Sequence, residues 1–146
     1  MQNYKIVNFT KLNPSQPFPD FRHVGSEESR QLASHLAQRL RLPLPADPLR
    51  LARRVSSCLK SVMGVNSLSD DFRLSQVLWR LRILPPEYVF VNWYRFDDVD
   101  EIKFADLESH FTDIWYPSSD DIEVFDSSLK WLIAVSHDGS VGICRT

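Results

Sequence analysis

The sequence is poor in glycine, cysteine and histidine, and it has no long apolar run. Only four glycines are present, and neither GxGxxG nor GxxxxGK[ST] occurs, which excludes the common phosphate-binding loops. No stretch approaches the roughly 18 apolar residues of a membrane span, and the first residues do not form a basic and apolar leader. We therefore expect a cytoplasmic protein that binds no membrane.

The two cysteines, Cys58 and Cys144, lie far apart and belong to no CxxC pair. This pattern predicts reduced, buried thiols of a cytosolic protein and leaves a single long-range disulfide open. The four histidines have no second His or Cys three or four residues away, as a zinc site would require. The acidic run 97–101 lacks the glycine and the terminal Glu of a calcium loop. We expect no metal and no cofactor.

The composition is that of a globular protein, with 146 residues, 43% hydrophobic and 25% charged. We interpret residues 1–146 as a single domain. Local patterns predict, in order, a strand at 3–10, a proline-rich loop at 12–24, helices from Ser26 to Pro43 and over 47–64 and 69–83, a strand at 88–96, an acidic turn at 97–101, a short helix at 103–115, a strand at 121–126 and a C-terminal hairpin.

Two of these elements have strong local signals. Asp47 before Pro48 is a typical helix start, because the carboxylate caps a backbone N–H and proline suits the first helical position. Asp138-Gly139 between two apolar runs indicates a two-residue type I′ hairpin turn. The fold class is therefore α+β. We expect an antiparallel sheet of about four to five strands, with three N-terminal helices and one short helix on one face.

Charge is distributed unevenly along the chain. Residues 1–84 carry 13 Lys and Arg against 6 Asp and Glu, whereas residues 85–146 carry 4 against 13. Either the two halves neutralise each other in the fold, or the acidic half faces a basic partner.

The charged residues allow three functions: an enzyme, a nucleic-acid-associated protein and a protein-binding protein. A small enzyme would use the adjacent carboxylates Asp120 and Asp121. A nucleic-acid-associated protein would use the basic face of the helices at 47–64 and 69–83, although the acidic excess disfavours this partner. Ser136-His137-Asp138 is interpreted as a turn, because neighbouring strand residues point to opposite faces. We expect no enzyme.

Protein binding fits the aromatic and acidic residues of 94–126 best. Aromatic side chains can anchor an interface, while carboxylates steer a basic partner toward it. For Trp115 the alternative of a core position stays open. The candidate partner-binding residues are Asp97, Asp98, Asp100, Glu101, Trp115, Tyr116, Asp120, Asp121 and Glu123.

The segment from Asp113 to Asp126, together with Trp131 and His137-Asp138-Gly139, resembles small bacterial immunity proteins of polymorphic toxin systems. The segment Leu84-Pro85-Pro86-Glu87-Tyr88 is similar to the Leu-Pro-x-x-Tyr entry of SMI1/KNR4-like immunity proteins, but the Asn-Gly-Gly that follows there is absent. The resemblance covers the C-terminal part of the chain only. It implies a cytosolic inhibitor whose partner is a cognate toxin or another basic protein, and it assigns no residue a role.

Overall fold

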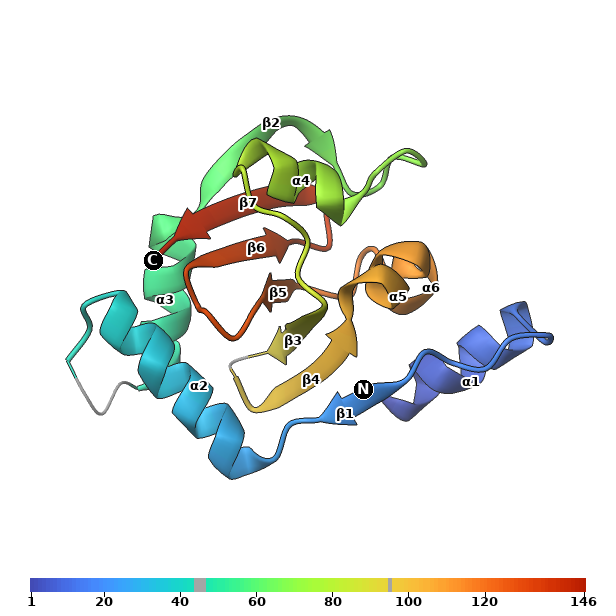
Figure 1. Cartoon of the computed structure of the whole chain (residues 1–146), viewed down its shortest axis with the longest axis horizontal. Helices are drawn as coiled ribbons and strands as arrows, with labels where there is room; N and C mark the ends of the chain where they lie inside the picture. The colour runs from blue at the N-terminus through green and yellow to red at the C-terminus, as the bar shows by residue number, and fades with distance from the viewer. Residues whose placement is uncertain (44–46, 95) are drawn as a thin grey trace.

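The fold is α+β, as the sequence predicts, and a computed structural model describes residues 1–43, 47–94 and 96–146 (Figure 1). The expected strand at 88–96 includes Arg95, which lies outside the described residues. The helices are α1 (Asn3–Leu12), α2 (Ser26–Arg39), α3 (Pro48–Cys58), α4 (Leu74–Arg80), α5 (Phe104–Ser109) and α6 (Phe111–Ile114). The strands are β1 (Phe21–His23), β2 (Lys60–Asn66), β3 (Tyr88–Tyr94), β4 (Asp98–Lys103), β5 (Ile122–Phe125), β6 (Trp131–Val135) and β7 (Ser140–Arg145).

All the strands belong to one antiparallel sheet in the order β1-β4-β3-β5-β6-β7-β2. The sheet has seven strands, more than the four to five expected. The additional strands are β1, β2 and β4, which local patterns assign to a loop, a helix and an acidic turn. β1 and β2 pair with strands far along the chain, and β4 lies between β1 and its sequence neighbour β3, so the residues of each strand do not decide its conformation alone.

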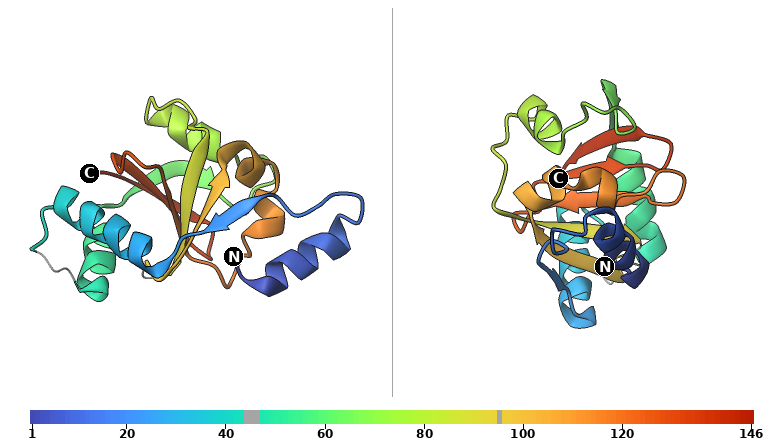
Figure 2. Two further views of the ribbon diagram at one scale, coloured as in Figure 1. Left: turned by 60° about the horizontal axis from the view of Figure 1, so that its bottom comes forward. Right: turned by 90° about the vertical axis from the view of Figure 1, so that its right-hand side faces the viewer.

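Helices cover both faces of the sheet, so the expectation that they pack on one face is wrong (Figure 2). Residues of α2 and α3, such as Leu36 and Val55, pack with Phe125 on what we call the α3 face. Residues of α4, α5 and α6 pack with Ile122 and Val124 on the opposite face, the α4 face. The alternation along β5 separates the two cores because successive strand side chains point to opposite sides.

The N-terminal segment is a helix and not the expected strand at 3–10. Its buried residues are Lys5 and Phe9, one helical turn apart. The Phe9 ring contacts the rings of Phe18 and His110, each with centroids 5.1 Å apart. A segment this short has little intrinsic preference, so these tertiary contacts decide its conformation.

The expected helix over 47–64 is correct at its start and wrong at its end. The backbone N–H of Leu49 donates to Asp47 Oδ1 at 2.8 Å, which confirms the cap. Helix α3 stops at Cys58, and the chain continues as edge strand β2, where Lys60 pairs with Ile143 of β7. The expected helix over 69–83 shortens to α4.

The C-terminal hairpin forms where expected, with a different turn. Gly139 N–H donates to the Ser136 carbonyl at 2.8 Å, and Gly139 has a φ of +89°. Asp138 is not in the left-handed region, so the loop is not type I′. A Cβ on residue 139 would collide with Asn66 and lie 2.8 Å from Leu68 Cγ, so this position requires glycine.

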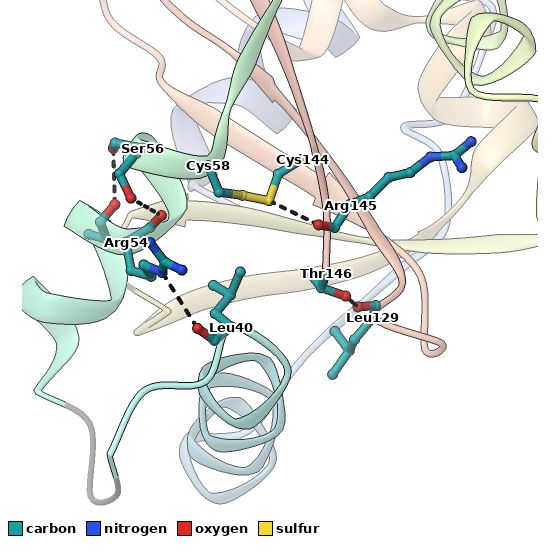
Figure 3. The surroundings of a disulfide bond; sticks show 10 residues. Leu40, Arg54, Ser56, Cys58, Leu129, Cys144, Arg145 and Thr146 are labelled. Atoms are coloured by element: carbon teal, nitrogen blue, oxygen red, sulfur yellow. Dashed lines mark hydrogen bonds between the residues drawn. A yellow bond between two sulfur atoms is a disulfide. The ribbon is translucent and has the colours of Figure 1, made fainter.

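The two cysteines form a disulfide, which contradicts the expectation of reduced thiols (Figure 3). Cys58 at the end of α3 bonds Cys144 of β7, with Cα atoms 5.5 Å apart. Nearby, Arg54 of α3 donates to the Leu40 carbonyl at 3.5 Å. These contacts hold α3 to the sheet and to the end of α2, which positions the cavity described below.

Candidate functional site

The strand register brings acidic residues from separate turns to one end of the sheet. Asn92 of β3 pairs with Glu123, and Ile122 of β5 pairs with Val135 of β6. The end of β3, the start of β5 and the end of β6 are therefore neighbours. The turns there contribute Asp97, Asp98, Asp120, Asp121 and Asp138, which we call the acidic end of the sheet.

The carboxylates of the predicted set at this end differ in exposure. Asp97 and Asp121 are exposed, and Asp98 is half-buried. Asp120 is 8% exposed and forms an ion pair with Lys5 of α1. The acidic end therefore offers a partner Asp97 and Asp121, together with Asp98, which also lies 3.9 Å from the α-amino group of Met1, while Asp120 is used internally.

Lys5 lies in an enclosure of aromatic rings. Its Nζ donates to the Ile114 carbonyl at 2.8 Å and lies 4.2 Å from the Tyr116 ring centroid and 4.7 Å from that of Trp93. Burial lowers the pKa of Lys5, and the hydrogen bond to Asp120 offsets part of this effect. The side chain is completely buried, so this ion pair and its cation–π contacts are part of the core.

Trp115 is a core residue, which settles the alternative left open by the sequence. Its side chain is 2% exposed, stacks on Phe111 with centroids 5.4 Å apart, and donates from Nε1 to the Asp120 carbonyl at 2.9 Å. It therefore has no surface to offer a partner. The expected helix at 103–115 is divided into α5 and α6 at His110, and Trp115 directly follows α6. Tyr116 is half-buried.

Asp100 and Glu101 point to opposite faces of β4 and are both paired. Asp100 is completely buried, accepts from Trp93 Nε1 at 2.8 Å and forms an ion pair with the α-amino group of Met1. Glu101 accepts from Arg22 of β1 at 2.8 Å. These residues hold β1 and α1 in place.

His23 joins Asp98 and Asp100 in a cluster that the sequence does not reveal. One ligand atom from each of the three residues lies within 4.8 Å of the others, as a metal ion would require. His23 and Asp100 are 77 residues apart in the sequence. They come together because β1 pairs with β4. The ammonium of Met1 lies against the same Asp100 carboxylate.

Glu123 lies in a cavity of about 460 Å³ between α3 and the sheet. Burial raises the pKa of Glu123 to about 7, while the Asn92 amide, which donates to Oε2 at 2.6 Å, acts in the opposite direction. Among the described residues, no ion pair involves Glu123. The other residues around the cavity are Leu49, Ala52, Arg53, Ser56, Leu59, Asp121, Ile122, Ala134, Val135 and Ser136.

Asp121 accepts hydrogen bonds from the backbone N–H of His137, at 2.8 Å, and contacts its Nδ1 at 2.9 Å. The contact between the Asp121 carboxylate and Nδ1 raises the pKa of the His137 imidazole above its usual value. Asp120 points instead to Lys5, so the two adjacent carboxylates do not form a pair for acid–base chemistry.

We predict that Asp121→Asn lowers the pKa of His137 toward about 6.5, because the imidazolium loses its main stabilising contact. An NMR titration of the imidazole would measure the midpoint. Asp138→Asn is the matched control, since Asp138 is the weakest of the contributors, and it should move the midpoint less. Equal shifts in the two variants would contradict the assignment.

The arginines of α3 and those beside α4 lie on opposite faces of the sheet. Arg50, Arg53 and Arg54 belong to α3 on one face of the sheet, whereas Arg73 and Arg80 flank or end α4 on the other. A footprint for a nucleic-acid backbone requires a continuous basic patch, which this separation does not provide.

Comparisons of the chain with protein-family models, with curated proteins and with solved structures found no match. Among the described residues, no helix has the length and apolar character needed to cross a bilayer.

Proposed function

We propose that this protein is a cytoplasmic, non-catalytic inhibitor of immunity-protein type, which binds a toxin or another basic protein through the acidic end of its sheet. The observation that supports the proposal most is the register, which brings Asp97 and Asp98 at the start of β4 and Asp121 before β5 to the same end of the sheet. Such a surface attracts a basic partner over a distance and would cover the residues that bind substrate phosphates.

The contact set differs from the nine residues named from the sequence. Asp97, Asp98, Asp121 and Tyr116 remain as surface candidates, Glu101 is half-buried beside Arg22, and Glu123 lies in the cavity beside α3. Trp115, Asp100 and Asp120 are enclosed and act by holding the surface together. In the reducing cytoplasm that we propose, Cys58 and Cys144 would be held as thiols, whereas an oxidising compartment would preserve the disulfide.

The test compares two charge reversals of equal size in pull-downs from the native host. Asp97→Lys with Asp121→Lys changes the acidic end, whereas Asp20→Lys with Glu87→Lys changes exposed residues at the opposite end of the sheet. We expect the first pair to weaken binding of the captured partner at least about tenfold, and the second to leave it unchanged.

The captured partner is then purified and tested for toxicity with and without each variant. The proposal requires that the wild type and the opposite-end control neutralise the partner and that the acidic-end variant does not. Equal neutralisation by both variants would show that the acidic end is not the binding surface.

A further inference from the structure

The cavity beside Glu123 combines a carboxylate with an apolar wall. Its volume of about 460 Å³ lies within the range of small-molecule sites, about 300–1,000 Å³. Leu49 and Ala52 of α3 and Ala134 of β6 supply apolar surface, while Ser56 and Ser136 supply hydroxyl groups. Apolar walls with a few converging polar groups are typical of ligand pockets.

Glu123 is held in this cavity at a fixed position. It lies on the α3 face of β5, opposite Ala134 in the register, and Asn92 Nδ2 donates to its Oε2 at 2.6 Å. Asn92 is itself 1% exposed and accepts the Phe96 N–H at 2.9 Å, so its amide orientation is fixed. Oε1 has no hydrogen-bond donor among the described residues and is the atom left for a ligand.

Charge decides which ligand fits. Asp121 adds a second carboxylate at the rim, and its field raises the pKa of Glu123 further, beyond the effect of burial. Arg53 on α3 is the cation that lines the cavity, and it forms no ion pair among the described residues. Glu123 is half-buried, and a carboxylate that has lost part of its hydration without gaining a cationic partner is costly, so a bound cation would offset this cost.

We infer that this cavity is a binding site for a small aliphatic amine, whose ammonium group pairs with Glu123 and whose hydrocarbon stem lies against Leu49, Ala52 and Ala134. The ligand class follows from the cavity alone and is independent of the protein partner proposed above. Binding should strengthen as the pH rises, because the ligand stays protonated while Glu123 ionises. Besides Glu123, the titratable groups facing the cavity are Asp121 and Arg53, while Asn92 is the neutral neighbour from β3.

The probe is n-butylammonium, followed by NMR shifts of the backbone amides of Ala52, Ser56, Glu123 and Ser136. We expect saturable shifts at pH 8 and an affinity about tenfold weaker at pH 6, since a carboxyl with a pKa of about 7 is mostly ionised at the first and mostly neutral at the second. Two matched probes separate the contributions. n-Butanol keeps the stem without the charge, methylammonium keeps the charge without the stem, and both should bind at least about tenfold more weakly.

Three variants test the residues. Glu123→Gln should weaken n-butylammonium binding about tenfold or more and remove its pH dependence, and Ala52→Leu should abolish binding by filling the cavity. Arg53→Gln should strengthen binding about twofold or more, because a repelling cation is removed. The inference is overturned if butanol binds as well as butylammonium, if Glu123→Gln binds like the wild type, or if the cavity amides do not shift.

Discussion

Replacing Lys5 by methionine should lower the free energy of unfolding by about 3–5 kcal/mol, because Asp120 would remain buried without its cation. Asp120 is 8% exposed, and its remaining donors among the described residues are the Tyr116 backbone N–H, at 2.8 Å, and the Ser119 hydroxyl, at 3.4 Å. The aromatic rings around Lys5 also lose their cation–π contact. Urea unfolding at pH 7 measures the difference.

Lys11→Met is the matched control, because Lys11 lies on the same helix and is exposed. It should change stability by no more than about 0.5 kcal/mol. The double variant Lys5→Met with Asp120→Asn should recover part of the loss, since the amide keeps the acceptor for Tyr116 N–H without the charge. A Lys5→Met loss as small as that of Lys11→Met would show that the ion pair is not part of the core.

Glu123→Gln should stabilise the protein at pH 8 by about 3 kcal/mol and have almost no effect at pH 4. The carboxyl has a pKa of about 7 in the fold, against 4.5 as its ordinary value. Between these values the folded state keeps a proton that the unfolded state has lost. The stability of the wild type therefore falls as the pH rises through this window and is constant above it. Glutamine cannot ionise and still accepts the hydrogen bond from Asn92.

Unfolding midpoints from pH 4 to pH 8 would show this difference directly. Asp97→Asn serves as the control, because Asp97 is an exposed carboxylate at the same end of the sheet. Its difference from the wild type should stay within about 0.5 kcal/mol at every pH. A Glu123→Gln difference that is the same at pH 4 and pH 8 would mean that Glu123 is not held in an environment that disfavours its charge.

Elements with a complete local signal could be predicted from the sequence. The Asp47-Pro48 start of α3, the strand at 88–94 and the hairpin around Gly139 depend on caps, alternation and turn residues within a few positions. By contrast, α1 and the strands β1 and β2 depend on partners far along the chain, whereas β4 pairs both with its neighbour β3 and with the distant β1. Their own residues fit more than one conformation, and long-range packing chooses among them.

The acidic residues could be identified from the sequence, but the sequence could not show which of them form buried ion pairs and which stay exposed. Lys5 and Asp120 are 115 residues apart, and Asp100 meets His23 only through strand pairing. Burial therefore divides the acidic residues of the 97–123 segment into enclosed ion pairs and exposed carboxylates. Trp115 shows the same limit, because its sequence context allows both a core and a surface position and the packing of the fold decides between them.

The salt dependence of the association rate tests the central claim most directly. With the captured partner immobilised, rates are measured at about 50 mM and about 300 mM salt for the wild type, for Asp97→Lys with Asp121→Lys, and for Asp20→Lys with Glu87→Lys. If the acidic end steers the partner, the wild-type and opposite-end rates fall about tenfold or more with salt, while the acidic-end variant starts slow and changes little. The same steep salt dependence in all three proteins would contradict the account.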